Sequence, residues 1–403
     1  MSRIARVALA YLVEPGHREL GTLVRTYGAE QALDLVLEGR GASPSLTDGV
    51  RGRLDQRGLS ANGLGQLALE EAERLGARIV TPEDVEWPAQ LEHLALITRE
   101  DGDRLHRDTD PPLCLWVRGV PSLADALDRS VAIVGSRAAT SYGQHVASEF
   151  AYGLANRDWT IVSGGAFGID AAAHRATLAA GGLTVAVLPC GIDRSYPLAH
   201  VGLLEQIADE GLLITEWPPG AAPHRMRFLI RNRVIAAATR GTVMVEAGAR
   251  SGARNTLRYA RLLGRPPMVV PGPVTSAVSV GCHAELRRGG TRLVSRFDEV
   301  IEEVGHVGEL AQIEQGPSLP EDTLDTTARR LLDAVLPRKA LTAEEVAAAA
   351  GLTGREARRN LPLLEAYGFV VATESGGYRL APRRKRAEAK EEEEEEEEAP
   401  TDA

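Results

Sequence analysis

The chain has 403 residues, of which 44% are hydrophobic and 25% are charged. This length exceeds that of one ordinary domain, so we expect two or three folded units. The formal net charge is −10, but residues 388–403 carry ten acidic side chains against one lysine, a net charge of −9. The rest of the chain is nearly neutral, so the overall charge does not exclude a nucleic-acid partner. Aromatic residues make up only 4%, which disfavours an extended base-stacking platform.

The cysteines and the hydropathy pattern narrow the class of protein further. Cys114, Cys190 and Cys282 lie far apart without a CxxC pair, which suits neither a zinc site nor a disulfide framework. The N-terminus lacks the apolar run of a secretory signal, and no stretch of about 20 apolar residues is long enough to span a membrane. We therefore expect a cytoplasmic protein without a bound metal, a cofactor or a membrane partner.

Residues 1–80 have the pattern of a small helical domain, of the SAM or helix-hairpin-helix kind. Apolar residues recur at helical spacing in two runs, first Ile4, Val7, Ala8, Tyr11 and Leu12, and then Leu20, Leu23, Val24 and Tyr27. Gly28 is a suitable end for the second helix, and residues 30–38 predict a third. Both a DNA-binding or partner-binding role and a purely structural docking role remain open for this domain.

Residues 131–305 have the pattern of an α/β domain. Prolines punctuate a connection over residues 81–130, and short apolar runs then alternate with helical stretches. The runs are 131–134, 160–163, 184–188, 212–215, 242–246 and 267–270. Continuous apolar strands that alternate with helices predict an extended Rossmann-like parallel sheet, covered on both faces. Such sheets bind ligands at the carboxyl ends of their strands.

The C-terminal part predicts a second folded unit and a tail. Residues 306–325 are polar and suit a linker. Over residues 326–382 the pattern gives three helices and a hairpin, which together predict a winged helix. Thr342 with Glu345, and Thr353 with Glu356, are spaced as capping boxes at the starts of two of these helices. The acidic residues 383–403 predict disorder.

Two loops after predicted strands have the composition of an anion-binding turn. The first strand ends in Gly135, Ser136 and Arg137, where the glycine permits close approach and the other side chains can donate to phosphate. The second strand leads into a glycine-rich loop with the candidates Ser163, Gly164, Gly165, Ala166, Gly168 and Asp170, followed by His174. The glycines are not spaced as GxGxxG, which disfavours a nicotinamide cofactor. Asp170 can instead cap a helix, and His174 can be a packed side chain.

The strongest physical signal is a basic stretch. Residues 222–265 contain ten arginines and one acid, Glu246, a net charge of +9. Such a stretch within a folded domain indicates a polyanion partner, and guanidinium groups match the geometry of phosphate. The candidate contacts here are Arg231, Asn232, Arg233, Ser251, Gly252 and Arg254. Together with the two loops, they would place anion-binding groups at three strand ends on one edge of the sheet.

Taken in chain order, these motifs resemble the DNA-processing protein A (DprA/Smf) family. The resemblance covers Gly135-Ser136-Arg137, residues 163–174, Gly191-x-Asp193-x-x-Tyr196-Pro197, Glu216-x-Pro218-x-Gly220, residues 231–236, Val245-Glu246-Ala247, Ser251-Gly252 and Val270-Pro271-Gly272. It implies a homodimeric single-stranded DNA-binding protein, without enzymatic activity, that protects DNA and loads the RecA recombinase during natural transformation or recombination. By position, it implies that residues 135–137 and 164–168, with Arg231 and Arg233, line the DNA pocket. Leu229-Ile230 and Ala253-Arg254 depart from the family pattern at the rim.

Two other functions compete with this interpretation. One is a nucleotide hydrolase related to the lysine-decarboxylase-like (LOG) group, with Glu246 as the catalytic acid. The PGGxGTxxE stretch of that group has no match here, and Glu246 can simply pair with an arginine. The other is a duplex-binding regulator that reads DNA with the predicted winged helix, on which Arg355, Arg358 and Arg359 share one helix face.

Overall fold

The computed structural model describes residues 2–97, 109–305, 324–337, 339–373 and 376–382. The chain divides into two compact units, residues 1–312 and residues 313–403. The predicted linker, apart from its last two residues, and the acidic tail lie outside the described residues.

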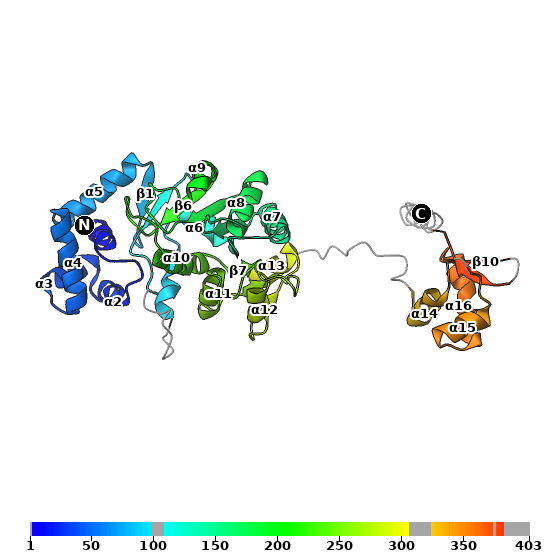
Figure 1. Ribbon diagram of the computed structural model, residues 1–403. Helices are drawn as coiled ribbons and strands as arrows, with labels where there is room; N and C mark the ends of the chain where they lie inside the picture. Colours follow the sequence, from blue (N-terminus) through cyan, green and yellow to red (C-terminus); the bar gives the residue numbers. More distant parts are fainter. Residues whose placement is uncertain (1, 98–108, 306–323, 338, 374–375, 383–403) are drawn as a thin grey trace, which may run out of the picture. The chain divides into compact units, whose positions relative to one another are not determined.

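The first unit begins with helices, as the sequence predicts (Figure 1). The helices are α1 (Ser2–Leu12), α2 (Arg18–Tyr27), α3 (Ala29–Glu38), α4 (Pro44–Arg57) and α5 (Ala61–Arg74). Gly28 ends α2 with a φ of 81°, a backbone conformation that favours glycine. Ser43 and Ser60 cap α4 and α5 by accepting hydrogen bonds from backbone amides. The sequence pattern did not identify these last two helices.

The centre of this unit is a nine-stranded sheet formed by described residues, in the order β1-β2-β6-β5-β4-β3-β7-β8-β9. The strands are β1 (Ala77–Val80), β2 (Leu115–Arg118), β3 (Ser130–Val134), β4 (Thr160–Ser163), β5 (Thr184–Val187), β6 (Leu212–Thr215), β7 (Gly241–Met244), β8 (Pro267–Val269) and β9 (Arg292–Leu293). The pairs from β6 to β9 are parallel, as predicted, whereas β1 and β2 add an antiparallel edge. The sheet is therefore mixed, and it begins well before residue 131.

Helices cover both faces of the sheet (Figure 1). On β3, Val131 and Ile133 belong to one apolar cluster and Ala132 and Val134 to the other, because neighbouring residues of a strand point to opposite faces. One face packs against α7 (Ser141–Ala155), α8 (Ile169–Ala179) and α13 (Phe297–Val304). The other packs against η1 (Ala89–Leu96), α6 (Leu123–Asp128), α10 (Arg225–Ala238), α11 (Ala253–Leu262) and α12 (Val280–Leu286).

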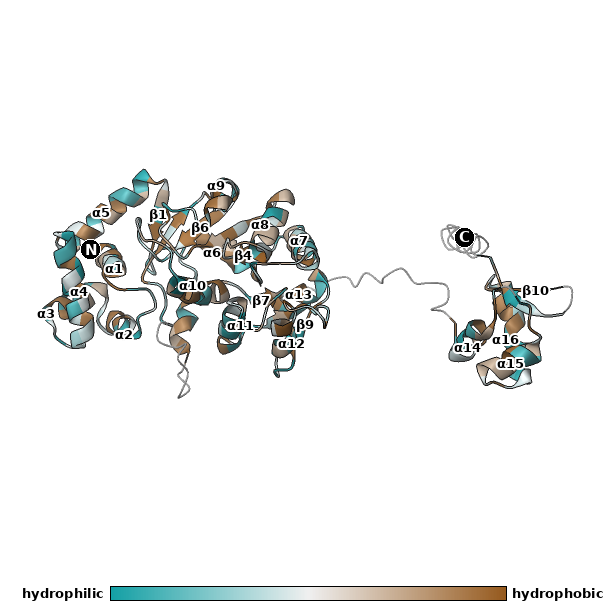
Figure 2. Ribbon diagram, viewed as in Figure 1, coloured by the Kyte–Doolittle hydropathy of each residue, from teal (hydrophilic) through white to brown (hydrophobic). Residues whose placement is uncertain are grey.

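The N-terminal helices share a core with the sheet. One apolar cluster joins Val7 of α1 and Ala68 of α5 with Ile79 of β1, Trp116 of β2 and Leu204 of α9 (Val201–Glu210). Trp116 is fully buried in this cluster. The predicted boundary near residue 80 thus falls inside a continuous core. In Figure 2 the outward-facing parts of α4 and α5 are largely hydrophilic, which agrees with a single buried face on these helices.

The chain order of the strands defines where a ligand is expected. From β3 the chain steps through β4 and β5 to β6, and it then returns to the other side of β3 to form β7. This reversal makes a topological switch point between β3 and β7, outside whose carboxyl ends open α/β sheets bind ligands.

The second unit contains three helices and a hairpin within its described residues. They are α14 (Thr326–Ala334), α15 (Ala343–Ala350), α16 (Gly354–Ala366), β10 (Val370–Ala372) and β11 (Tyr378–Leu380). Both predicted capping boxes are present, at the starts of α15 and α16. The order of elements is the one predicted, and the assignment as a winged helix stays a prediction.

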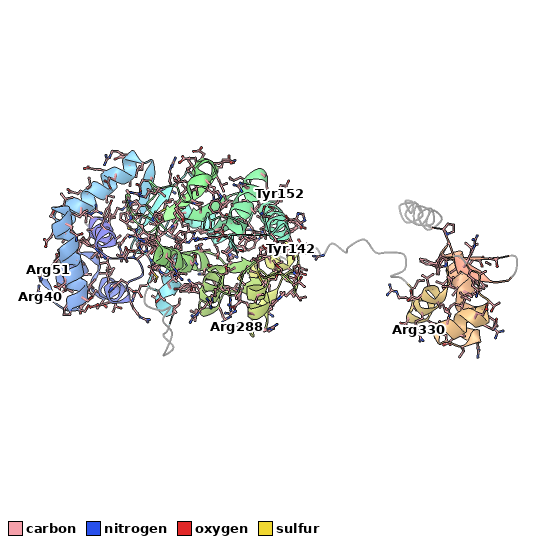
Figure 3. All side chains as sticks on the ribbon, viewed as in Figure 1. Arg40, Arg51, Tyr142, Tyr152, Arg288 and Arg330 are labelled. Atoms are coloured by element: carbon pink, nitrogen blue, oxygen red, sulfur yellow. The ribbon has the colours of Figure 1, made fainter. Side chains whose placement is uncertain are left out.

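The shared core leads to a prediction for Trp116. Trp116→Ala is expected to lower the free energy of unfolding by about 3–5 kcal/mol, because a large buried side chain is removed from between the helices and the sheet. Denaturant unfolding followed by circular dichroism measures this loss. Tyr152→Ala, at an exposed position of α7 labelled in Figure 3, is the control and should change the free energy by less than about 0.5 kcal/mol. Equal effects of the two substitutions would contradict a shared core.

Candidate nucleic-acid interface

A groove of about 810 Å³ lies at the carboxyl ends of β3 and β7. We call it the β3–β7 groove. The side chains and backbone that line it come from the loops that follow β3 to β8, the start of α8 and the helices α10 and α11. The lining residues are Val134 to Ala138, Ala166, Asp170, Tyr196, Pro223 to Arg225, Phe228, Leu229, Arg231, Asn232, Ile235, Gly248, Arg250 to Ala253, Thr256 and Val278. The groove therefore lies at the switch point of the sheet.

The loop after β3 forms one wall of the groove. Gly135 leaves no room for a Cβ atom, which would collide with the side chain of Ile169. The carbonyl of Ser136 accepts a hydrogen bond of 3.2 Å from the amide of Ile169, which holds the loop against α8. Arg137 is exposed, and its guanidinium lies 4.6 Å from the centre of the Phe228 ring, within the range of a cation–π interaction.

The glycine loop after β4 is organised around Asp170. The amides of Gly164 and Ala166 donate to its Oδ2 atom over 3.2 and 3.4 Å. These amides, which we expected to be available to phosphate, are thus engaged by an internal carboxylate. Ser163 is buried and donates to the carbonyl of Ile133 over 2.6 Å. Of this segment, only Ala166 and Asp170 line the groove.

Glycine is required at two positions of this loop for its close packing. Gly168 has a φ of 78°, and a Cβ atom there would collide with the carbonyl of Ser136. A Cβ atom on Gly164 would collide with the guanidinium of Arg231. The carbonyl of Gly165 is hydrogen-bonded to His200 Nδ1 over 3.0 Å. The glycines therefore serve to bring the loop onto neighbouring elements rather than to enclose a ligand with bare amides.

Arg231 forms part of the floor of the groove. Its side chain is only 4% exposed, and its Nη1 atom donates to the carbonyl of Val187 at the end of β5. Burial lowers the pKa of Arg231 to about 10, and the nearby Asp170 opposes this shift. Burial also raises the pKa of Asp170, against the influence of Arg231 and of the two loop amides. Arg231 therefore contributes a fixed, partly compensated positive charge beneath the groove.

Besides Ser163, Gly164, Gly165 and Gly168 of the glycine loop, three more predicted contact residues lie outside the groove lining. Arg233 is fully buried and forms an ion pair of 2.6 Å with Glu216. Arg254 forms an ion pair of 2.7 Å with Glu285. His174 is fully buried in α8, where Nδ1 lies 2.7 Å from the hydroxyl of Thr184. Because these side chains are occupied or inaccessible, none of the three is among the contacts that we propose for a ligand.

The net charge of the basic stretch is partly compensated by acids from other parts of the chain. Ion pairs join Arg227 to Glu14 and Arg240 to Asp128, over 2.5 and 3.3 Å. Glu285 pairs with Arg261 as well as with Arg254, and Arg265 donates to backbone carbonyls. The sequence count of +9 thus overstates the positive charge that a ligand would meet.

Three exposed arginines at the groove remain available. Within the described part of the chain, Arg225 and Arg250 have neither an ion pair nor a hydrogen bond, and Arg137 has only its contact with the Phe228 ring. Of the three, only Arg137 belongs to a motif that predicted a contact. Arg225 and Arg250 were counted in the basic stretch, but nothing in the sequence distinguished them from the eight other arginines there.

Aromatic side chains also line the groove, although their number in the chain is low. The rings of Tyr196 and Phe228 lie edge to face, with centres 5.4 Å apart. Neither ring was predicted from the sequence as a contact residue. Phe228, Arg231, Asn232 and Ile235 all line the groove from α10, and their spacing of i, i+3, i+4 and i+7 is the signal that identifies them as one helix face.

The remaining predicted residues have structural partners at the groove. Asn232 donates from Nδ2 to the carbonyl of Gly252 over 3.2 Å, which ties α10 to the start of α11. The Ser251 hydroxyl accepts from the amide of Ala253 over 3.3 Å. These contacts fix the position of the loop between β7 and α11 at the edge of the sheet.

Glu246 has a structural role at the start of α7. It is buried, and it accepts hydrogen bonds of 2.9 and 2.5 Å from the amide and the hydroxyl of Thr140, the residue that caps this helix. Its hydrogen-bond partner is therefore Thr140 and not an arginine as the sequence suggested. A carboxylate held in this way neutralises a helix N-terminus, which disfavours its use as a catalytic acid.

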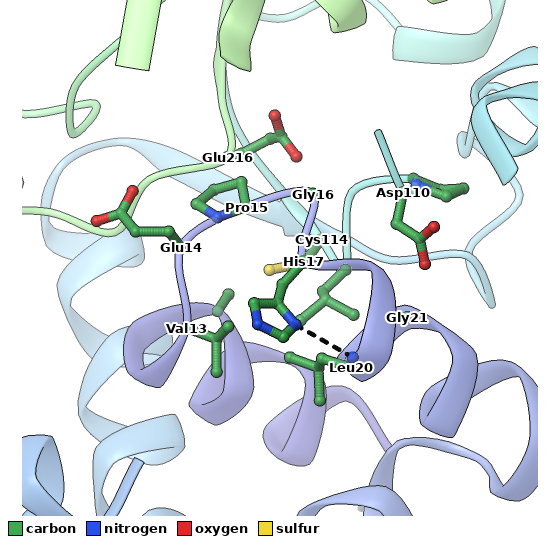
Figure 4. A pocket seen from close by; sticks show the side chains of 13 residues that line it. Val13, Glu14, Pro15, Gly16, His17, Leu20, Gly21, Asp110, Cys114 and Glu216 are labelled. Atoms are coloured by element: carbon green, nitrogen blue, oxygen red, sulfur yellow. Dashed lines mark hydrogen bonds between the residues drawn. The ribbon is translucent and has the colours of Figure 1, made fainter. Parts of the chain in front are cut away.

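A second, much smaller cavity lies between the N-terminal helices and the sheet (Figure 4). Glu14, His17, Asp110, Cys114 and Glu216 are among its lining residues. Its volume of about 20 Å³ suits about one water molecule. His17 Nδ1 accepts from the amide of Leu20 over 3.3 Å, and it thereby caps α2. This cavity is too small to be a ligand site.

The described residues contain no group of three or more His, Cys, Asp and Glu side chains placed to hold a metal ion. Nor does any helix in the described ranges have the length and hydropathy needed to cross a membrane.

Comparison with known proteins places the chain in a family. A family model described as DNA recombination-mediator protein A matches residues 78–305. The chain belongs to this family. A protein of Mycobacterium tuberculosis named as a putative DNA processing protein DprA is 45% identical over 374 residues, which are 92% of each chain. Protein Smf of Escherichia coli is 33% identical over 282 residues, covering 68% of this chain and 73% of that protein.

A solved structure supports the same family membership. The structure of DNA processing protein A from Streptococcus pneumoniae matches with a TM-score of 0.61 and 28% sequence identity. The match covers 76% of this chain and 98% of that structure. The family region begins at β1, which agrees with the sheet starting near residue 77. The resemblance inferred from the motifs is confirmed, and the chain is a member of a family of recombination mediators.

The buried His174 leads to a prediction about acid stability. Burial lowers its pKa to about 3, so between pH 3 and the ordinary value of about 6.5 the unfolded chain binds a proton that the folded chain does not. This histidine therefore makes the free energy of unfolding fall as the pH drops below about 6.5, with a slope of up to about 1.4 kcal/mol per pH unit. His174→Leu is expected to make the pH dependence between about pH 6.5 and 5 shallower in urea unfolding.

The matched control is His93→Leu, because His93 is exposed on η1 and has no ion pair within the described residues. The control should keep the wild-type pH dependence. An unchanged slope in His174→Leu would show that His174 takes up a proton in the folded protein.

Proposed function

We propose that this protein binds single-stranded DNA in the β3–β7 groove, protects it and delivers it to the RecA recombinase during recombination or natural transformation. The observation that carries the proposal is the set of three exposed arginines, Arg137, Arg225 and Arg250, at one groove on the carboxyl edge of the sheet. Membership of a recombination-mediator family supports it.

The chemistry of the groove suits the DNA backbone. Guanidinium groups donate two parallel hydrogen bonds to a phosphate and remain charged at neutral pH. The three arginines come from the loop after β3, the start of α10 and the loop before α11. A bound chain that contacts all three would therefore follow the groove across the switch point of the sheet. Contacts of this type carry no base specificity, so we expect binding that is independent of sequence.

The two aromatic rings favour a single strand over a duplex. Tyr196 and Phe228 are both partly accessible in the groove, and Arg137 lies over the Phe228 ring. The face of an unpaired base can stack on such rings, whereas in a duplex the base faces are already stacked. The stacking area is small, so we expect phosphate contacts to supply most of the affinity.

Neither alternative function has comparable support. The nucleotide hydrolase would need Glu246 as an acid, but this carboxylate is held by the amide and the hydroxyl of Thr140, the N-cap residue of α7. For the duplex-binding regulator, Arg355, Arg358 and Arg359 are all exposed on α16, and Arg358 lies 3.4 Å from Glu344. A preference for duplex DNA that disappears when residues 313–403 are removed would favour the regulator. A single-strand preference that persists without them favours the groove.

The groove proposal makes a prediction about salt dependence. Alanine substitution of Arg137, Arg225 or Arg250 should weaken binding to an oligothymidylate and reduce the slope of log K against log salt by about 0.7 for each phosphate that the variant no longer neutralises. The triple variant should lower this slope by about 2. Fluorescence anisotropy titrations at several salt concentrations measure both quantities.

Arg157→Ala is the matched control. Arg157 is exposed at the C-terminal end of α7, on the edge of the sheet opposite the groove, and the substitution makes the same change in net charge. It should leave the slope unchanged. Wild-type slopes in all three groove variants would refute the groove as the DNA site.

Our proposals that the protein delivers DNA to RecA and that it forms a homodimer rest on the family resemblance. The delivery to RecA can be tested separately. On an oligonucleotide covered with a single-strand binding protein, the wild type should shorten the lag of RecA filament formation, because the groove holds the strand for transfer. The triple arginine variant should lose this effect, and Arg157→Ala should retain it. Lag times that do not depend on the wild-type protein would exclude the loading role while leaving DNA binding intact.

A further inference from the structure

Besides the groove and the small cavity of Figure 4, a third, polar pocket lies where the N-terminal helices meet the loop that follows β6. Its volume is about 260 Å³, and α1, α4, residues 217–221 and the first turn of α10 line it. We call it the α4 pocket. Its charged and amide-bearing lining side chains are Glu14, Arg53, Gln56, Arg57 and Arg227. Pro218 and Gly220 of the family motif Glu216-x-Pro218-x-Gly220 also line it, but the sequence assigned that motif no ligand.

The charges of the α4 pocket do not balance. Arg227 is paired with Glu14 over 2.5 Å, and it also lies 5.7 Å from the centre of the Trp217 ring. Burial alone would raise the pKa of Glu14, but its hydrogen bonds with Arg227 and Trp217 lower it, so this carboxylate stays ionised and occupied. Within the described residues, Arg53 and Arg57 have no carboxylate partner. The pocket therefore keeps two uncompensated positive charges.

The contacts of Arg53 and Arg57 position these side chains without neutralising them. Arg53 donates from Nη1 to the carbonyl of Leu12 at the end of α1. Arg57 lies 5.3 Å from the centre of the Tyr11 ring. The two arginines are four residues apart on α4, a spacing at which like charges destabilise a helix. The helix dipole stabilises a cation at the C-terminal end of α4, which explains the presence of Arg57. It does not explain Arg53, which lies one turn earlier.

The α4 pocket adjoins the β3–β7 groove. One short segment separates them, since residues 217–221 and Arg227 face the pocket, whereas residues 223–225 and Phe228 line the groove. Hydrogen bonds fix this segment: the amide of Gly220 donates to Asp193 Oδ1 over 2.8 Å, and the amide of Gly191 donates to the carbonyl of Ala221 over 3.0 Å. A strand that leaves the groove past Arg225 reaches the pocket by crossing this segment.

We propose that the α4 pocket binds a backbone phosphate of the same single strand that occupies the β3–β7 groove. The proposal rests on the function proposed above and deepens it. Two guanidinium groups without counter-charges select an anion, and the volume of about 260 Å³ far exceeds the about 20 Å³ of the cavity in Figure 4, which suits one water, so a hydrated phosphate fits. The N-terminal helices thereby lengthen the segment of DNA that the protein holds, in addition to packing against the sheet.

The test compares oligothymidylates of two lengths on the full chain. An oligomer of about 6 nucleotides is long enough to occupy the groove, and one of about 24 nucleotides reaches the pocket as well. Arg57→Gln is the decisive variant, because in the described residues Arg57 makes no hydrogen bond whose loss would disturb the fold. It should weaken binding of the long oligomer, with a salt slope lower by about 0.7, and leave the short oligomer unaffected.

Two further variants make the outcome specific. Arg53→Gln should behave as Arg57→Gln does, with its thermal unfolding measured because Arg53 also contacts the end of α1. Arg157→Gln, which makes the same charge change on the opposite edge, should bind both lengths as the wild type does. Wild-type binding of the long oligomer by Arg57→Gln, or an equal loss for both lengths, would overturn the α4 pocket as a phosphate site.

The two proposals fail separately in this experiment. The groove variants Arg137→Ala and Arg250→Ala should weaken both lengths. If they do so while Arg57→Gln has no effect, the α4 pocket is excluded and the groove stands. If they bind both lengths as the wild type does, the groove assignment itself is wrong.

Discussion

The groove depends on one buried arrangement, the guanidinium of Arg231 packed beneath the glycine loop. Arg231 reaches from α10 to the carbonyl of Val187 on β5, and it lies so close to Gly164 that no side chain fits there. Asp170, held by the amides of the same loop, opposes its charge. This arrangement ties the ends of β4 and β5 to α8 and α10. A buried arginine so anchored gives the groove a rigid floor, from which more exposed side chains can project.

The positive charge available at the groove depends on which arginines are used to hold the fold together. Most arginines of the basic stretch stabilise the fold, because each buried or half-buried guanidinium needs a carboxylate or carbonyl partner. Arg233 with Glu216, and Arg254 with Glu285, show this use. The exposed arginines at the groove are spared such pairing and keep their hydrogen-bonding capacity for a ligand. The site is thus defined less by the number of arginines than by which of them lack an internal partner.

The N-terminal helices are part of the same structure and not an appended module. Val7 and Ala68 pack with Trp116 of the sheet, and Glu14 reaches across to Arg227 at the start of α10. The junction therefore places Arg53 and Arg57 beside the segment that borders the groove. The role that we propose for these helices in holding DNA rests on this position, which the sequence pattern of isolated helices does not reveal.

Local features of the fold could be predicted from the sequence, because each is decided within a few residues. The buried strands from β3 to β8 are continuous apolar runs, Gly28 ends a helix, and the capping boxes at Thr342 and Thr353 start two more. The motif around Gly135 and the order of the later motifs were sufficient to identify the family. The edge strands β1 and β2 were missed, since they are short and lie outside the alternating pattern.

Only the tertiary structure decided which candidate side chains face a ligand. Arg227 and Glu14 are 213 residues apart in sequence, and Arg233 and Glu216 are 17 apart, so no local pattern shows that these arginines are neutralised. His174 and Arg231 belong to equally suggestive motifs, yet folding places one wholly in the core and the other at the floor of the groove. The sequence by itself determined the family, the parallel part of the sheet and the edge of the sheet at which the groove lies. The availability of each charge was decided by packing, because it depends on partners brought together from distant parts of the chain.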